Sequence, residues 1–447
     1  MLVLLLTTCK KDFLDVRPDK ALLVPATLAD MRALLDNNLA VFNQSPALTT
    51  VADGDTYTTD AGFNAYVLDE ERKSYIWAAD IFGNVSAGDW NIPYKQIFYA
   101  NVVLEGLGKI SPPGAEQAEY NAVKGTALFY RAFAYYNLMQ QFAPPYRAAS
   151  AATDKGVPIR LTSGVGPNAV RSSVAATYEQ VLTDLRNARA LLPASTAFKT
   201  RPPVAGAMAM LARVYLVMGD YARAGRYADS CLQQNPALIN YNTLSTTATR
   251  PFVKALPNSN DEIVFYSIAL SYGFGSSTSP TVADPALYAS YAANDLRKVI
   301  FFRALAPGFK FKGNYAGIIA IFSGIATDEL YFIRAECAAR LGNTAAALAD
   351  LNKVLITRWK TGTYVTMNAA TPEDALKLIL MERRKELTGR GTRWTDLRRL
   401  NDDPRFALTL SRKVLGNTYT LEPGSKRYTY PIPLDELRLN ALEQNER

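Results

Sequence analysis

Apolar residues recur at helical spacing through several long stretches of the chain, and the clearest of these is 203–236. Its pattern is carried by seven residues, namely Leu211, Ala212, Tyr215, Gly219, Tyr221, Ala224 and Pro236. The two alanines are small enough for two helices to approach closely, Gly219 permits a turn between them, and Pro236 stops the second helix. The pattern therefore predicts a hairpin of two packed helices.

A second stretch, residues 328–358, repeats this pattern with different residues. Ala335, Gly342 and Ala347 reproduce the spacing of the two alanines and the glycine in the first stretch. This spacing is that of the tetratricopeptide repeat, a helical hairpin that buries its apolar face by stacking on its neighbours. Two copies in one chain predict a scaffold built from helical repeats.

Three further stretches predict helices that extend this scaffold. Residues 90–142 are apolar on more than one side, which is typical of helices packed between neighbours. Residues 174–192 predict a helix in front of the first hairpin, and residues 371–400 open with a Thr-Pro pair that is typical of a helix start. We therefore predict a mainly α fold of about four tetratricopeptide-like helical pairs, in residues 90–142, 174–236 and 328–400.

Two long stretches do not fit this helical pattern. Residues 43–89 and 237–326 are rich in Gly, Ser, Thr, Asp, Pro and aromatic residues, and their apolar runs are short. They predict irregular, loop-rich insertions on the scaffold. Binding residues commonly lie in loops that a rigid scaffold positions, so we expect the ligand face in these two stretches.

The composition narrows the possible functions, chiefly because the chain contains no histidine. Histidine-based acid–base catalysis, Ser-His and Cys-His nucleophile pairs and most catalytic zinc sites are therefore excluded. The 25 tyrosines favour half-exposed binding surfaces as well as helix packing. A binding protein is the better expectation than an enzyme.

The net charge of +8 does not by itself indicate a nucleic-acid partner. Basic residues are dense only in 383–399, where Glu386 and Asp396 alternate with the arginines, so we predict ion pairs there and no nucleic-acid binding. Trp394 is expected to pack between helices. Cys231 and Cys337 lie on apolar helical patterns and are expected to be buried.

The first nine residues form a short apolar run that ends in two threonines and Cys9. A bilayer span needs about 20 apolar residues, so this run predicts the remnant of a secretory signal in residues 1–8. Leu6-Thr7-Thr8-Cys9 is similar to a lipobox, which would make Cys9 the acylated first residue and a membrane anchor. The alternative is an apolar terminus with an incidental cysteine.

Several short motifs resemble the SusD/RagB family of outer-membrane nutrient-binding lipoproteins. The segment from Cys9 to Pro18 is similar to the opening of that family after its lipid-modified cysteine. Two predicted helices also resemble helices of the family. The first has the matching spacing of Trp90, Tyr94, Ile97 and Asn101, and the second contains Arg131–Leu138 followed by Phe142.

The C-terminal part carries the same resemblance. Residues 382–387 and 391–399 are close to the family signature, and Tyr430-Pro431-Ile432-Pro433 resembles the usual ending. Arg390 stands where an acidic residue is common in the family. The resemblance implies a single domain over residues 9–447, with 43–89 and 237–326 as its variable ligand face.

The resemblance implies a surface protein of the outer membrane that captures an oligosaccharide or polysaccharide and passes it to a SusC-like TonB-dependent transporter. Aromatic faces that stack on sugar rings, with carboxylates and arginine for the hydroxyls, would form the site. Trp77 is the best candidate, and the full set of ligand candidates is Asp53, Asp55, Tyr57, Tyr66, Arg72, Tyr75, Trp77, Tyr272, Phe274, Tyr288 and Tyr291.

Two alternatives stay open beside glycan binding. A site rich in arginine and carboxylates rather than aromatics would favour a peptide or another nutrient. A helical carbohydrate-active enzyme would need two carboxyls about 5–10 Å apart across a cleft. The pair of carboxylates in Asp53-Gly54-Asp55 falls short of the six to eight oxygens that calcium takes, so no metal and no cofactor are predicted.

Overall fold

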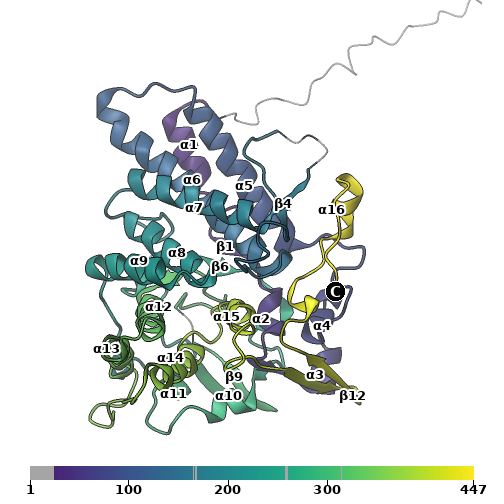
Figure 1. Ribbon diagram of the computed structural model, residues 1–447, viewed down its shortest axis with the longest axis vertical. Helices are drawn as coiled ribbons and strands as arrows, with labels where there is room; N and C mark the ends of the chain where they lie inside the picture. Colours follow the sequence, from purple (N-terminus) through teal and green to yellow (C-terminus); the bar gives the residue numbers. More distant parts are fainter. Residues whose placement is uncertain (1–24, 165, 167–168, 257–259, 314) are drawn as a thin grey trace, which may run out of the picture.

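The computed structural model describes residues 25–164, 166, 169–256, 260–313 and 315–447. The predicted signal remnant in residues 1–8 and the predicted lipidation site at Cys9 lie outside these residues. Helices dominate the described part, and Figure 1 shows most of them stacked along one side of the molecule. None of the helices found there is long and apolar enough to cross a bilayer.

The scaffold consists mainly of long helices, each of which packs against the one before it, except the last and shortest. Their bounds are α5 (Gly88–Leu107), α6 (Gln117–Phe142), α7 (Val174–Leu191), α8 (Val204–Val217), α9 (Tyr221–Gln234), α12 (Thr327–Arg340), α13 (Thr344–Leu355), α14 (Pro372–Glu386) and α15 (Arg393–Leu400). Helices α5 to α9 form one continuous stack, and α12 continues it by packing on α9. The predicted mainly α, repeat-built fold is confirmed.

The two predicted hairpins, α8–α9 and α12–α13, have the physical features that their spacing required. Gly219 and Gly342 have φ values of +75° and +84°, a conformation that residues with a side chain rarely adopt. The side chains of Asp220 and Asn343 then cap the second helix of each hairpin. The small residues are completely buried between the helices: Ala212, Ala224, Ala335 and Ala347.

Short elements make up the rest of the molecule. The remaining α-helices are α1 (Leu28–Leu35), α2 (Leu48–Ala52), α3 (Asp60–Asn64), α4 (Asp69–Tyr75), α10 (Pro285–Ala289), α11 (Arg297–Phe301) and α16 (Leu434–Leu439). The strands are β1 (Gln44–Ser45), β2 (Thr56–Tyr57), β3 (Lys155–Pro158), β4 (Arg171–Ser173), β5 (Ile263–Phe265), β6 (Ile268–Ala269), β7 (Val282–Ala283), β8 (Phe302–Leu305), β9 (Gly308–Phe311), β10 (Ile325–Ala326), β11 (Leu410–Val414) and β12 (Asn417–Leu421). Each strand pairs with one other strand only.

Two of these strand pairs join the two loop-rich stretches, and each links strands more than 220 residues apart in the chain. Strand β1 pairs in parallel with β6, and β2 pairs antiparallel with β7, with Thr56 opposite Ala283. The stretches 43–89 and 237–326 are therefore side by side in the folded chain. Strands of two to five residues carry too short an alternation to be predicted from the sequence.

The dense basic stretch in residues 383–399 forms buried ion pairs. Arg383 and Arg399 both bond Asp396, at 2.9 and 2.8 Å, and Arg390 bonds Asp328 at 2.7 Å. The predicted ion pairs are confirmed, although several join different helices rather than successive turns of one. Burial of Trp394, Cys231 and Cys337 is also confirmed.

Candidate ligand-binding site

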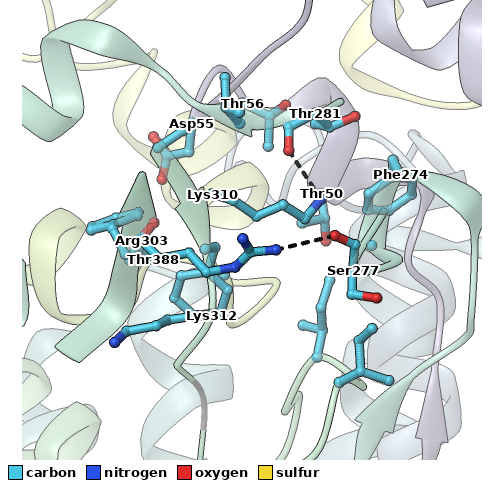
Figure 2. Close-up of a pocket in the computed structure, with 18 of the residues that line it drawn as sticks. Thr50, Asp55, Thr56, Phe274, Ser277, Thr281, Arg303, Lys310, Lys312 and Thr388 are labelled. Carbon is cyan, nitrogen blue, oxygen red and sulfur yellow. Dashed lines mark hydrogen bonds between the residues drawn. The ribbon is translucent and has the colours of Figure 1, made fainter. Parts of the chain in front are cut away.

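A pocket lies where the two loop-rich stretches meet. The end of α2 and strand β2 supply one wall, and β7, β8 and β9 supply another, with residues 249–250 and 388–389 at its margins. Its cavity volume is about 90 Å³. A single water needs about 10–15 Å³ by this measure, so the space is that of about six waters, comparable with one sugar ring. Figure 2 shows the side chains that enter it.

The Asp53-Gly54-Asp55 motif forms a turn at this pocket. The backbone N–H of Asp55 donates to Oδ1 of Asp53 at 2.9 Å, and Gly54 has a φ of +82°. Oδ1 of Asp55 is bonded by Arg384 at 2.8 Å and lies 3.7 Å from Nε of Arg393. Burial, together with repulsion by Asp55, raises the pKa of Asp53 well above its ordinary value. Two arginines therefore lie against the carboxylate of Asp55.

Two oxygens of the pocket wall lack a hydrogen-bond partner among the described residues. They are Oγ1 of Thr50 and Oδ2 of Asp55, and both are buried. A buried oxygen without a partner costs about 1–3 kcal/mol, and a ligand hydroxyl or amide can supply the missing bond. These two atoms point to a ligand that donates hydrogen bonds.

Phenylalanine rings form the apolar part of the wall. Phe274, Phe302 and Phe311 line the pocket, and the ring of Phe274 lies parallel to that of Tyr272 with centroids 6.0 Å apart. Aromatic faces of this kind pack against the CH faces of sugars or against apolar side chains. The wall therefore combines apolar rings with hydrogen-bonding oxygens.

Basic side chains also line the pocket: Arg250, Arg303, Lys310 and Lys312. The ammonium of Lys310 donates to the carbonyls of Ser279 at 3.0 Å and Thr281 at 3.1 Å, and Lys312 is held by the carbonyls of Thr246 and Ala248. Only 5% of the surface of either lysine is exposed. We call these four residues the pocket cations.

Burial weakens the protonation of three pocket cations: Lys310, Lys312 and Arg250. Together with repulsion by Arg303 and Arg250, it lowers the pKa of Lys310 to about 8. It also lowers the pKa of Lys312, again with repulsion by Arg303, and that of Arg250. Sequence reasoning missed all four residues, because isolated basic residues in an irregular stretch look like ordinary solvated surface.

Of the eleven predicted ligand residues, Asp53, Asp55 and Phe274 lie at this pocket. Trp77, the best candidate from the sequence, does not. Its side chain is only 1% exposed, and its Nε1 donates to the carbonyl of Ala52 at 2.9 Å. The guanidinium of Arg412 lies 4.8 Å from its ring centroid on the other side. Trp77 is a core residue, and its prediction as a surface platform is corrected here.

Three of the predicted tyrosines are also buried, with their hydroxyls bonded inside the protein. Tyr66 bonds Thr281 at 2.8 Å, Tyr75 accepts a bond from the N–H of Thr58 at 3.1 Å, and Tyr291 donates to the carbonyl of Lys385 at 2.7 Å. Because their faces are covered, they support the walls of the site and do not meet solvent.

The other four candidates lie outside the pocket lining. Tyr272 donates to Asp89 at 3.1 Å, and Arg72 bonds Asp69 at 2.6 Å. The ring of Tyr288 stacks on Phe309 with centroids 3.5 Å apart. Tyr57, on β2, is 37% exposed. Of these four, Tyr57 has the most open ring for a ligand that extends from the pocket.

Comparison with known proteins gives two family matches. A model described as starch-binding and associating with the outer membrane matches residues 12–216, and the SusD family model matches residues 328–446. SusD-like protein P2 of Formosa agariphila is 30% identical over 238 residues, which are 51% of this chain and 44% of that protein. The match therefore spans less than half the length of this relative.

Solved structures share the fold over almost the whole chain. A SusD superfamily protein from Bacteroides thetaiotaomicron has a TM-score of 0.74 at 24% identity, with 94% of this chain and 100% of that chain covered. A SusD-like carbohydrate binding protein from Bacteroides vulgatus has a TM-score of 0.70 at 20% identity, with 93% and 97% covered. These structures share the fold, and the two family matches show that the chain belongs to the SusD/RagB family.

Proposed function

We propose that this protein is a non-catalytic binding lipoprotein that captures glycans in the pocket between its two loop-rich stretches. It would deliver them to a SusC-like TonB-dependent transporter at the surface of the outer membrane. Family membership supports the general role of a binding protein, and a matching family model is described as starch-binding and outer-membrane associated. The transporter partner, and the anchor at Cys9, remain parts of the proposal.

The observation that carries the glycan proposal is the pair of unpartnered oxygens beside an apolar wall. Sugars present many hydroxyl donors together with CH faces. Thr50 Oγ1 and Asp55 Oδ2 supply acceptors for the hydroxyls, and Phe274 lies in the same lining. A purely apolar ligand would leave both oxygens unsatisfied.

Peptide capture is the second candidate, because the pocket also contains the features expected for it. Arg250 and Arg303 lie near Asp53 and Asp55 in one lining, as a site for peptide charges and amides would require. An acidic peptide would fit this lining better than a basic one, since the pocket cations lie in it.

An enzyme is the third candidate, and it would depend on Asp53 and Asp55. A glycosidase uses one carboxyl as acid and a second as base or nucleophile. One carboxylate oxygen of Asp55 is already bonded by Arg384 and lies 3.7 Å from Nε of Arg393. A hydrolysis assay on every glycan that binds separates this candidate from the proposal, which predicts no turnover.

The proposed site is tested by Thr50→Val, which removes the unpartnered hydroxyl and keeps the shape of the side chain. We expect binding of the cognate glycan, found by array screening and measured by calorimetry, to weaken about three- to tenfold, the value of one neutral hydrogen bond. The thermal stability of the free protein should not fall, because the hydroxyl has no partner to lose among the described residues.

Thr58→Val is a matched control within the same chain. Its Oγ1 is also buried and lacks a partner in the part of the chain that the structure describes, but Thr58 does not line the pocket. We expect glycan affinity to be unchanged in this variant. If Thr50→Val and Thr58→Val bind the cognate glycan as well as the unchanged protein does, the pocket is not the capture site.

A further inference from the structure

Arg303 and Lys310 place two positive charges next to each other, which does not stabilise the folded chain. They are direct partners across the β8–β9 hairpin, so their side chains leave the same face of the pair. Like charges directly opposite each other destabilise an antiparallel pair. Figure 2 shows the two side chains lying side by side across the pocket, with their charged ends toward Thr281 and Ser277.

Carbonyls, not carboxylates, hold all four pocket cations. Arg303 donates to the carbonyl of Ser277 at 3.3 Å, and Arg250 donates to those of Thr249 at 3.2 Å and Lys312 at 3.0 Å. Among the described residues, none of the four lies in an ion pair with an acidic side chain. A carbonyl offers hydrogen bonds but leaves the positive charge uncompensated.

The two acidic residues of the lining do not neutralise this charge. Asp55 is paired with Arg384 and Arg393, which bring more positive charge than it removes. Burial and repulsion by Asp55 raise the pKa of Asp53 well above its ordinary value, which opposes a negative charge on its carboxyl. The pocket therefore has an excess of positive charge in a partly desolvated space.

Such a concentration of buried charge is costly unless a counter-ion enters. Burying an ion without a partner is strongly unfavourable, and an anion that binds there recovers much of that cost. The lowered pKa of Lys310 is consistent with this cost and would rise when an anion binds beside it.

We propose that the pocket selects acidic glycans, in which a carboxylate or sulfate on the sugar ring contacts Arg303 and Lys310. This inference rests on the proposed glycan capture and adds the charge class of its ligand. The cavity of about 90 Å³ fits one ring that bears such a group, so the charged ring would enter and the rest of the chain would extend outward.

The hydrogen-bonding capacity left on these side chains suits an oxyanion. Lys310 has three ammonium donors and uses two of them on carbonyls of the described residues. Arg303 has five N–H donors and uses one on Ser277. A guanidinium can bond two oxygens of a carboxylate or sulfate at once, and Thr50 Oγ1 and Asp55 Oδ2 remain for hydroxyls of the same ring.

The test compares ligands that differ only in charge. Calorimetry with the full protein would use tetragalacturonate and its methyl-esterified form, and a sulfated galactan tetrasaccharide and its desulfated form. We expect the charged member of at least one pair to bind about tenfold or more tightly, with affinity falling between about 0.05 M and about 0.5 M NaCl. The pair that responds identifies carboxylate or sulfate as the recognised group.

Variants locate the effect in the pocket. Lys310→Gln and Arg303→Gln should each weaken binding of the charged ligand about ten- to hundredfold, as expected for one charge-assisted hydrogen bond. Arg226→Gln removes the same charge from an exposed position on α9 and should leave affinity unchanged. Melting temperatures of all three variants separate lost binding from lost folding, and the salt dependence of the unchanged protein needs no variant.

Other outcomes would overturn the inference in distinguishable ways. Equal binding of charged and uncharged glycans, or unchanged affinity in both pocket variants, removes the charge selection and leaves glycan capture intact. If none of these glycans and no neutral glycan on an array binds, while a tetraglutamate peptide does, the proposed glycan function fails as well. Lower melting temperatures with normal affinity in Lys310→Gln would mean that the lysine only fastens its two loops.

Discussion

Two groups of buried basic residues in this protein differ in what surrounds them. In the first, which we call the ionic core, Arg297 and Arg358 are completely buried and paired with carboxylates. Arg297 lies 2.7 Å from Asp295 and 3.1 Å from Glu386, and Arg358 lies 2.7 Å from the same Glu386. In the second, the pocket cations have only carbonyl partners among the described residues.

The difference appears in the protonation of the two groups. Although burial lowers it, attraction to Asp295 and Glu382 raises the pKa of Arg297 well above its ordinary value. Burial and repulsion by neighbouring arginines lower the pKa of Lys310 to about 8. The ionic core thus satisfies its own charge and joins the loop-rich stretch to α14, whereas the pocket presents charge that the protein leaves unmatched.

Removing one carboxylate from the ionic core should have the largest effect on stability. Glu386→Gln takes the shared partner from Arg297 and Arg358 and leaves two buried cations short of negative charge. We expect the free energy of unfolding to fall by about 3–5 kcal/mol, measured by chemical denaturation. Glu373→Gln on the same helix breaks only exposed pairs, with Lys377 and Arg405, and should cost less than about 1 kcal/mol. Equal losses in both variants would contradict the special role of burial.

Lowering the pH should destabilise the scaffold through its paired carboxylates, by less than Glu386→Gln does. Although burial opposes it, attraction to Arg383 and Arg399 lowers the pKa of Asp396 to about 2, against an ordinary 3.8. The resulting stabilisation is fully present above about pH 4 and is lost as the pH falls toward 2. It amounts to about 2 kcal/mol, which Asp396→Asn should lack when unfolding is measured from pH 6 to pH 2. Parallel pH profiles for the two proteins would refute this assignment.

The helical scaffold could be predicted because its signals are long and local. The two hairpins need only the spacing of alanine, glycine and apolar residues within about 30 positions, and packing then follows from the pattern. Two of the strand pairs needed contacts between strands more than 220 residues apart, and each of those strands is too short to leave a pattern. The sequence therefore predicted the parts of the fold that depend on residues close together in the chain.

The candidate site could be predicted only in part, because contacts between distant residues form much of it. Asp53, Asp55 and Phe274 were predicted because polar and aromatic residues in loops suggest binding, and all three line the pocket. Trp77 was wrongly placed at the surface, since its burial depends on Ala52 and on Arg412, which lies more than 300 residues later. Arg303 and Lys310 become informative only when the β8–β9 register sets them opposite each other.

The smallest expected effect on the free energy of unfolding is that of removing a charge from the pocket. This prediction separates the pocket cations from the ionic core most sharply. Lys310→Met loses two bonds to carbonyls but also relieves repulsion by Arg303, so we expect a change of less than about 1 kcal/mol at pH 7. The unchanged protein should also gain stability as the pH rises from about 8 toward 10.5, since its unfolded state binds more protons there. Arg303, Arg250 and Lys312 remain in the variant, so the difference between the two pH profiles reports Lys310 alone. A loss as large as that of Glu386→Gln would place Lys310 among the structural ions and end the distinction between the two groups.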